Sequence, residues 1–370
     1  MTSGPAARSR RWFLALFPAG IAFAADRTGK GRVFPSAVKR FADAATEFPV
    51  LRLTDPAHTS FLPAASGRAV SRRNNFLIYA SDRIGSFEAF HLDFKTGQSR
   101  QLTESSDLDP ASLTLFGEDR DFAWFDGNRM FSAGVSSLKT REHYEITDGF
   151  ERGAGLSVSE DSQHAAIVEK KGTTHRLQLI HLSSGNAVKL VECDEELRDP
   201  LPRPRRASIL YRRAGAVWLA NYDGRQNYRL KLAEGETGPA TWSPDGRSVL
   251  YLNYPSDPHR LHNIREFIPD TNEDRMIAQT SQYVGFAPNT DASVFVGASG
   301  SKASPYVLLL VRAVQREMTL AEHRASDPKM VAPIFSPNSQ RVFFTSDRDG
   351  KPAIYSMSVA KLVEETASAN

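Results

Sequence analysis

Basic side chains and histidines recur along this 370-residue chain, next to short stretches rich in β-branched and aromatic residues. If the fold gathers them at one end of the molecule, such a ring of bases suits an anionic ligand, for example a uronate sugar or another carboxylate. Arg and Lys are also ordinary loop residues, so a solvated rim without a ligand is an equally weighted interpretation. The set comprises Arg83, Arg129, Lys170 with Lys171, Arg212 with Arg213, His259 with Arg260, Lys302, Arg348 with Lys351, and, between the repeats, His58, Lys329, Asp109, Asp199 and Asp327.

The densest histidine cluster is His259-Arg260-Leu261-His262-Asn263. Two histidines three residues apart can bind a metal ion from one face of a helix. This stretch reads instead as a loop entering a strand, where residues i and i+3 point to opposite faces. The pattern therefore argues against a metal pair. The sequence also contains no nucleophile motif, no phosphate-binding loop and no His-rich metal signature.

A repeated unit organises these residues. Its clearest copy, Phe335–Met357, reads as a polar turn after a short strand, a second strand at Arg341–Thr345, an Asp-Arg-Asp-Gly turn, and a third strand at Pro352–Met357. A period in the forties with several short strands per copy is the signature of β-propeller blades. Related nine-residue cores, roughly 40 to 49 residues apart, start at Ser71, Gly117, Ser159, Arg203, Ser243, Ala287 and Ser336.

The sequence therefore predicts an all-β fold, a seven-bladed β-propeller spanning residues 48–360. The last copy lacks an outer strand, because residues 361–370 read as a helical or frayed tail. Val50–Thr54 resembles Gln98–Thr103, the outer strand of the first copy. We expect this N-terminal strand to complete the last blade and close the ring, which removes a free sheet edge. Residues 25–47 form a lead-in segment, with a helical stretch expected near Ser36–Thr46.

Residues 1–24 read as a twin-arginine signal peptide. Ser9–Leu14 carries the paired arginines, and the apolar run Trp12–Phe23 leads to Ala22-Phe23-Ala24, a small-x-small cleavage site. The run is too short to span a bilayer, so we expect a periplasmic or secreted protein without stable membrane insertion after signal removal. An uncleaved anchor is the alternative. Cys193 is the only cysteine, which leaves no intramolecular disulfide, and the net charge of +3 argues against a nucleic-acid binder.

Two families share features with these motifs. FTSDRDGKPAIYSM and TWSPDGRSVLYLN resemble the repeats of TolB-type propellers. A longer resemblance, from about Val50 to Met357, is to the oligogalacturonate lyases of polysaccharide lyase family 22, carried by LRLTDP, LIYASDR, LDFKTGQSRQLTE, AVWLANYDG, TWSPDGRSVLYLNY and FFTSDRDGKPAIY in the family's order and spacing. This resemblance implies a seven-bladed propeller that cleaves short pectic galacturonides by β-elimination with a bound manganese ion. The chemistry needs a cation on the C6 carboxylate and a base for the C5 proton.

The residues at the family's metal positions differ from the family pattern. The family uses a histidine in the sixth blade and a Gln-x-x-His-x-His run before the last blade. Gly285 stands at the first position, and Asp327, Met330 and Ala332 stand at the others. Of these, only Asp327 is suited to bind a metal ion, so the resemblance implies manganese while its ligands are absent from these positions.

The family's catalytic positions are also substituted. The histidine ahead of the Trp-x-Pro-Asp-Gly turn becomes Pro239, and the arginine before Trp-Phe-Ile becomes Ala216. A site rebuilt on other residues would use Arg213 and His259 as its catalytic groups. Substrate-binding candidates on the same loops are His58, Arg83, Arg212, Arg260, Lys302, Lys329 and Arg348.

Three functions remain open at this point. The chain is a lyase whose catalytic and metal-binding residues differ from those of the family, or it is a non-catalytic relative that binds an acidic oligosaccharide through the same basic rim. The third alternative is a TolB-like scaffold whose partner is another protein.

Overall fold

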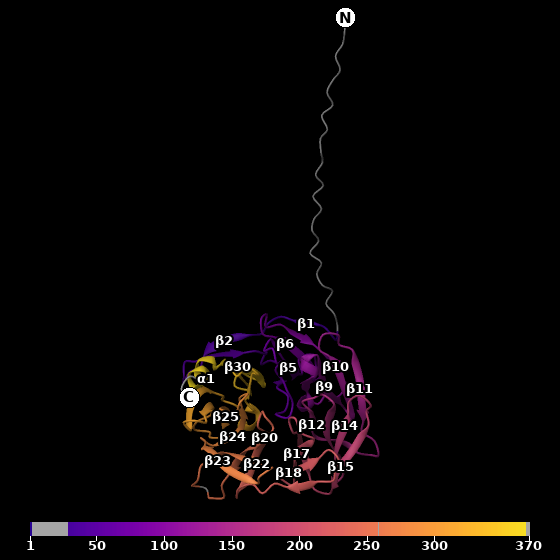
Figure 1. Ribbon diagram of the computed structural model, residues 1–370. Coiled ribbons are helices and arrows are strands. Elements are labelled where there is room, and N and C mark those ends of the chain that lie inside the picture. The colour runs from indigo at the N-terminus through magenta and orange to yellow at the C-terminus, as the bar shows by residue number, and fades with distance from the viewer. Residues whose placement is uncertain (2–28, 258, 368–370) are drawn as a thin grey trace.

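The sheets of the protein are arranged in a ring, the arrangement of a β-propeller (Figure 1). The structure is a computed structural model that describes residues 1, 29–257 and 259–367. The expected twin-arginine and cleavage motifs therefore lie outside the described residues. Within the described part of the chain, no helix is long and apolar enough to cross a membrane.

Each sheet is a meander of short strands. The first sheet contains, in hydrogen-bonded order, β1 (Val33–Phe34), β7 (Ser99–Gln101), β6 (Glu88–Asp93), β5 (Phe76–Ser81) and β4 (Ser60–Phe61). The second contains β11 (Thr140–Glu145), β10 (Arg129–Gly134), β9 (Asp121–Asp126) and β8 (Thr114–Phe116). The third contains β15 (Ala187–Cys193), β14 (Thr174–His181), β13 (His164–Lys171), β12 (Glu151–Val158), β16 (Leu197–Pro202), β17 (Ser208–Arg213), β18 (Ala216–Asn221) and β19 (Asn227–Arg229).

The remaining sheets complete the ring. One contains β20 (Glu236–Trp242), β21 (Val249–Tyr254), β22 (Asn263–Ile268) and β23 (Glu273–Gln279), and the next β24 (Tyr283–Pro288), β25 (Val294–Ser299), β26 (Tyr306–Val311) and β27 (Arg316–Glu322). The last contains β2 (Lys39–Ala42), β3 (Pro49–Arg52), β30 (Ala353–Ser358), β29 (Arg341–Ser346) and β28 (Ile334–Phe335). Short 3-10 helices are η1 (Pro110–Ser112), η2 (Gly117–Asp119) and η3 (Pro328–Val331), and the helix α1 (Ala360–Ala367) follows β30.

The eight-stranded sheet consists of two four-stranded meanders, β12–β15 and β16–β19. A single parallel bridge, Ala154 opposite Arg198, joins their first strands. The first strands of these two units thus lie side by side.

A serine begins the turn that joins the first and second strands of several sheets. The Oγ atom of Ser243 donates to Asp245 Oδ1 at 2.6 Å and accepts the Ser248 backbone N–H at 3.0 Å. Ser336 repeats this pattern, donating to Asn338 Oδ1 at 2.7 Å and accepting from Arg341 N at 2.9 Å. Such side-chain hydrogen bonds fix a tight polar turn. The turns expected from the repeated cores are confirmed at these positions.

The predicted pairing of the N-terminal strand with the end of the chain is confirmed. Val50, Leu51 and Arg52 of β3 pair with Met357, Ser356 and Tyr355 of β30, and β2, β30 and α1 lie together in Figure 1. The expected tail is helical over Ala360–Ala367.

The helical stretch expected near Ser36–Thr46 is wrong. Lys39–Ala42 forms the strand β2, which pairs with β3. Phe41 in this strand packs edge-on against Tyr355, with the ring centroids 6.4 Å apart. Sheet pairing and this packing outweigh the local helical propensity. The strand ends at Asp43, whose Oδ1 accepts the backbone N–H groups of Ala45 and Thr46 in a turn.

Packing between neighbouring sheets forms the core. One cluster joins Leu250, Leu252 and Ile264 to Phe295 and Leu310 of the next sheet. Each sheet buries its faces against both neighbours, which is how a propeller assembles a core that no single blade has.

Candidate functional site

The loops predicted to carry the site lie at one end of the ring. Because neighbouring strands are antiparallel, the loop between the second and third strands of a sheet and the loop into the next sheet emerge at the same end. A hydrogen bond between two such loops, from Lys351 N to Pro56 O at 2.9 Å, agrees with this. We call this end the loop end, and the end with the serine turns the turn end.

Arg212, which the sequence predicted to bind substrate, is buried and links two sheets by hydrogen bonds. Its side chain is 9% exposed. The Nη1 atom donates to Gly215 O at 3.0 Å and to Thr237 O at 3.1 Å, and Nη2 donates to Gly238 O. Its hydrogen bonds thus fix the start of β20 against the hairpin of β17 and β18.

Three further predicted cations are also held by protein groups. Arg348, whose side chain is 8% exposed, donates to Glu322 O at 2.8 Å and lies 3.8 Å from Asp43 Oδ2. The other two lie against aromatic rings: Arg213, paired with Glu195, over Trp218, and Arg83 over Phe34.

The other predicted residues lie closer to solvent. His259, Arg260, Lys302 and Lys329 are exposed, and His58 is half-buried. His259 follows Asp257, whose Oδ1 accepts the His259 backbone N–H at 2.9 Å. These groups remain free to meet a ligand at the loop end, but among the described residues no contact joins those that come from different sheets.

Arg198, a residue that the sequence did not single out, lies on the first strand β16. Its side chain is 43% exposed, while its Nε atom is buried and has no hydrogen-bond partner among the described residues. The nearest carboxylate oxygen, Asp199 Oδ2, is 3.7 Å away, and the same oxygen lies 3.8 Å from Arg212 Nε. Buried donors normally find a partner. Arg198 is therefore placed to receive a hydrogen-bond partner.

Arg152 stands on the neighbouring first strand β12. Its guanidinium donates to Gly127 O at 2.8 Å and lies 3.5 Å from Asp109 Oδ2. The sequence signal for Arg152 and Arg198 was weak, because both precede the repeated cores and stand where a loop was expected to end. The parallel bridge at Ala154 brings them onto adjacent strands.

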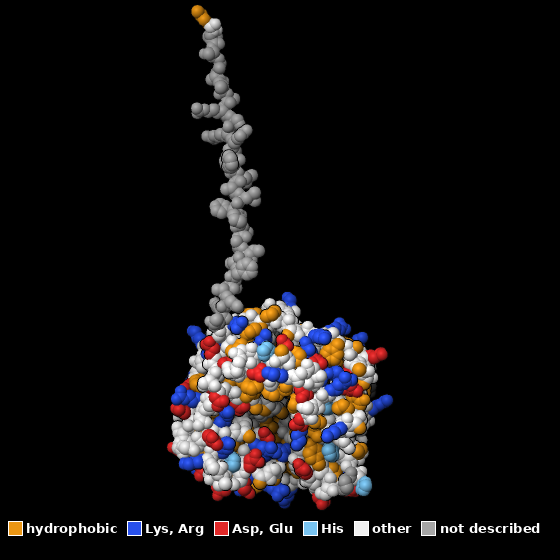
Figure 2. Space-filling model, turned by 180° about the vertical axis from the view of Figure 1, so that it is seen from behind, with side chains coloured by type: hydrophobic (Ala, Val, Ile, Leu, Met, Phe, Trp, Pro, Cys, Tyr) orange, Lys and Arg blue, Asp and Glu red, His pale blue; other side chains and the backbone are white. Residues whose placement is uncertain are grey.

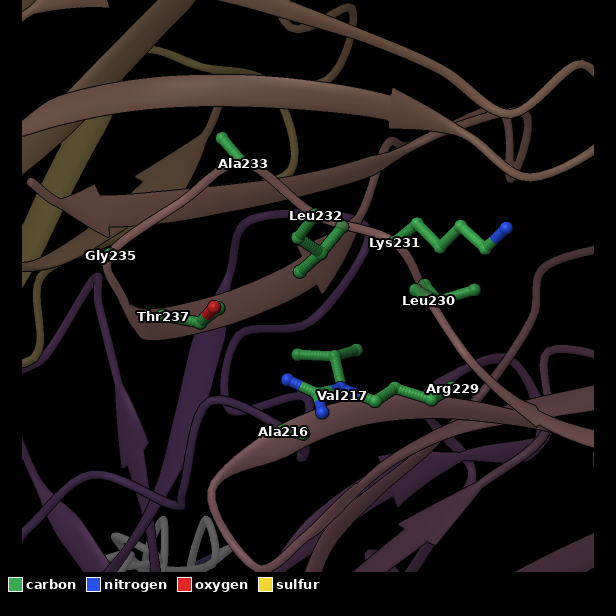
Figure 3. A pocket seen from close by; sticks show the side chains of 9 residues that line it. All are labelled: Ala216, Val217, Arg229, Leu230, Lys231, Leu232, Ala233, Gly235 and Thr237. Carbon is green, nitrogen blue, oxygen red and sulfur yellow. The ribbon is translucent and has the colours of Figure 1, made fainter.

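A cavity of 360 Å³ opens next to Arg212, between β18 and β20 (Figure 3). Ala216 and Thr237 line it, so the structure brings the position of Ala216 close to the start of β20. In Figure 3 the guanidinium of Arg229 lies toward Ala216 and Val217, whereas Lys231 points away. Arg229 is the last residue of the outer strand β19, and Lys231 lies in the connection from β19 to β20. Neither was singled out from the sequence.

Tyr254 covers the backbone beside Pro239. A Cβ atom placed on Gly238 would lie 2.6 Å from the Tyr254 hydroxyl oxygen, so only glycine permits this approach. The ring of His262 packs on Tyr254 with the centroids 4.4 Å apart. Burial, together with the nearby Glu236, raises the pKa of Tyr254 to about 12, so the phenol is protonated at neutral pH.

The positions that hold manganese in the resembling family do not fit that ion here. Asp327 is exposed and accepts the Lys329 backbone N–H at 2.9 Å as the cap of η3. A Cβ atom on Gly285 would meet only Pro333 Cδ, at 3.8 Å, which leaves room without any donor. In the part of the chain that the structure describes, no three His, Cys, Asp or Glu residues are grouped to hold a metal ion.

The cavity inside the ring lies at the turn end. Its volume is 430 Å³, and its walls come from the first strands and serine turns, including Phe116, Ser159, Trp242 and Phe335. Figure 2 shows one face of the ring hollowed at its centre, with hydrophobic side chains exposed in the hollow and charges of both signs around it. The expected cations belong to the other end.

Comparison with known proteins finds similar sequences that align with most of the chain. No family model matches the chain. An oligogalacturonide lyase from Pectobacterium atrosepticum is 24% identical over 88% of this chain and 97% of its own length, and an oligogalacturonate lyase from Dickeya dadantii is 23% identical over the same shares. The chain is therefore distantly homologous to oligogalacturonate lyases over most of its length, as predicted.

Solved structures agree on the fold. An oligogalacturonate lyase in complex with manganese superposes with a TM-score of 0.84 at 22% identity, covering 90% of this chain and 98% of that one. The oligogalacturonate lyase from Vibrio parahaemolyticus gives 0.83 at 22% identity, covering 89% and 98%. TolB from Acinetobacter baumannii gives 0.46 at 12% identity, covering 76% and 78%. The propeller fold is thus shared with the lyases.

Proposed function

We propose that the protein takes short galacturonide oligosaccharides at the loop end of the ring and cleaves them by β-elimination, as an oligogalacturonate lyase-like propeller. The observation that carries the proposal is Arg198, an accessible guanidinium whose buried Nε lacks a partner. A uronate carboxylate would bind the exposed part of this guanidinium through charge-assisted hydrogen bonds. The distant homology to galacturonide-cleaving lyases supports this choice of anion.

The surface between Arg198 and Arg229, which we call the sector, can bind more than one sugar unit. Arg212 lies on β17, between the strand of Arg198 and that of Arg229, and it is held by Asp199 and by backbone carbonyls. Each galacturonate unit carries one carboxylate, so an oligomer can place neighbouring carboxylates on Arg198 and Arg229. Arginine neutralises a carboxylate without a metal ion, which fits a chain whose described residues include no group of three metal-binding side chains.

In β-elimination a base removes the C5 proton, the electron pair forms the C4=C5 double bond, the C4–O4 bond breaks, and the departing oxygen takes a proton. Tyr254 is protonated at neutral pH and adjoins the substituted catalytic position at Pro239. We assign it as the proton donor to the departing oxygen. His259 is the candidate for the base, because its side chain is exposed. The hydrogen bond to Glu195 raises the pKa of Arg213, so Arg213 stays protonated and would act as a cation that holds the substrate.

The test measures binding and turnover separately. Calorimetry with tri-galacturonate should give saturable binding that weakens as salt rises. Replacing Arg198 or Arg229 by Met should lower the affinity at least about tenfold, which corresponds to the loss of one charge-assisted contact. The matched control is Arg247→Met at the turn end, where the side chain is 86% exposed. Unchanged affinity in both site variants would remove this sector from the site.

A non-catalytic galacturonide-binding protein is the second candidate. It is favoured by the substitutions at Gly285, Met330 and Ala332, which remove the donors at the family's metal positions. This candidate predicts the same binding and the same effect of Arg198→Met, but no unsaturated product. Failure to bind any galacturonide would instead move the function to a scaffold for another protein.

Two further features belong to this proposal. We count the eight-stranded sheet as two blades, which makes the ring seven-bladed, because a single bridge joins its halves. An experimental structure tests this count.

We also propose export by the twin-arginine route to the periplasm or beyond. Fractionation of cells that carry the Arg10→Lys and Arg11→Lys variants tests this proposal.

A further inference from the structure

A second cavity, remote from the loop end, contains two histidines. Its volume is 430 Å³, and it opens on the outer part of the unit β12–β15, near the turn end. Its walls also come from the neighbouring unit, through Tyr222. The lining residues are His164, Leu179, His181, Ser184, Asn186, Val188 and Tyr222. None of these residues enters the proposed galacturonide site.

The two histidines form a cross-strand pair. His164 of β13 and His181 of β14 are direct partners in the antiparallel ladder. Their ring centroids lie 5.1 Å apart, and the ring planes are almost perpendicular, at 89°. Two imidazoles bound to one tetrahedral zinc ion through nitrogens at about 2.0–2.1 Å have centres about 5 Å apart. The rings therefore already have the separation that a shared metal ion requires.

The hydrogen bond of the His181 ring fits a metal ligand. His181 Nδ1 is 2.9 Å from Ser183 Oγ, a hydroxyl that can accept the Nδ1 proton and so leave Nε2 unprotonated. Ligand histidines commonly hold their second ring nitrogen in this way. His164 Nδ1 is buried and has no hydrogen-bond partner among the described residues.

We propose that His164 and His181 together bind one divalent transition-metal ion of the kind that prefers imidazole nitrogen, namely Zn²⁺, Ni²⁺ or Cu²⁺. Solvent molecules in the cavity complete the coordination, because within the described residues no third His, Cys, Asp or Glu joins the pair. Two fixed imidazoles give an open site, and Tyr222 packs against His164 with ring centroids 5.2 Å apart, which holds that ring in place. Mn²⁺ and Mg²⁺ prefer oxygen ligands and are excluded by this donor set.

Titration of the purified protein, without an affinity tag, tests the site. We expect calorimetry to give one ion per chain for each of the three metals, with Cu²⁺ bound most tightly and Mn²⁺ not bound by the pair. His164→Gln and His181→Gln should each lower the affinity at least tenfold. His175→Gln is the matched control, because His175 is a half-buried histidine of the same strand β14 with its Nδ1 on Thr173 O.

A second readout locates the ion. Ni²⁺ or Cu²⁺ at substoichiometric levels should broaden the imidazole proton signals of His164 and His181 before those of His175. Thermal unfolding of each variant checks that it is folded, and in the wild type Zn²⁺ should raise the midpoint by mass action. Wild-type affinity in both glutamine variants, or broadening that starts at His175, would overturn the proposal.

Discussion

Val50 of β3 lies directly opposite Met357 of β30, although the two residues belong to opposite ends of the chain. Both side chains are buried, Val50 completely, and both belong to the cluster that packs the last two sheets together. The ring is closed by this pairing, so its stability depends on a strand that precedes every repeat.

Val50→Asp should therefore open the ring. A buried carboxylate without a partner lowers the free energy of unfolding by at least about 3 kcal/mol. Urea unfolding followed by circular dichroism measures the change. The control is Val33→Asp in β1, where the side chain is 52% exposed and the loss should stay below about 0.5 kcal/mol. Equal stability of the two variants would mean that the β3–β30 pairing does not close the ring.

Arg212→Met should destabilise the protein by about 3 kcal/mol. The substitution leaves three backbone carbonyls, those of Gly215, Thr237 and Gly238, without their donor. Guanidinium chloride unfolding measures the loss, and Arg260→Met on an exposed loop is the control. A variant with normal stability and abolished galacturonide binding would return Arg212 to the role predicted from the sequence.

Stability should fall in mild acid because of His91. Burial, with Arg100 opposite it in the ladder, lowers the pKa of His91 to about 4 from its usual 6.5. Between these values the unfolded chain binds the proton and the folded protein does not, so stability is present above pH 6.5 and is lost as the pH falls toward 4. The loss amounts to about 2–3 kcal/mol.

His91→Gln should flatten this dependence. Unfolding free energies at pH 7 and pH 5 compare the wild type with this variant and with a control variant, His175→Gln, in which a half-buried histidine is replaced. Because several carboxyl groups titrate in the same range, only the difference between the variant and the control reports on His91. An identical pH dependence in all three proteins would contradict the assignment.

Tyr254→Phe should lower the rate of β-elimination about 100-fold, because the departing oxygen loses its proton donor. Galacturonide affinity should stay within about twofold, since the ring still covers Gly238. Steady-state kinetics and calorimetry separate the two effects. Tyr228→Phe on the exposed outer strand β19 is the control. A rate unchanged by Tyr254→Phe would exclude the phenol from the reaction.

The propeller was readable from the sequence because its signals are local. The spacing of the serine turns and the alternation in Arg341–Ser346 each report on one hairpin, and their repetition reports on the ring. The likeness of Val50–Thr54 to an outer strand predicted the closing pair. The lead-in strand β2 was missed because Lys39–Ala42 has no strong strand pattern and becomes a strand only by pairing with β3.

The site was less readable, because the partner of a charged side chain is set by tertiary contacts. Nothing in the sequence around Arg348 distinguishes it from Lys329, yet the first donates to Glu322 O and the second is exposed. The proposed role of Arg198 depends on the bridge between β12 and β16, which the spacing of the repeats does not predict. The sequence therefore predicted cations on loops at one end of the ring but could not separate structural cations from available ones.

The measurement that tests the central claim most directly is ultraviolet absorbance on mixing the protein with tri-galacturonate, because β-elimination creates an absorbing unsaturated uronate. The wild type should produce a steady rise without added manganese, and Arg198→Met should reduce the initial rate at subsaturating substrate at least about tenfold. No rise with the wild type, with or without manganese, would contradict the lyase activity. A rise that is the same in Arg198→Met would contradict the site.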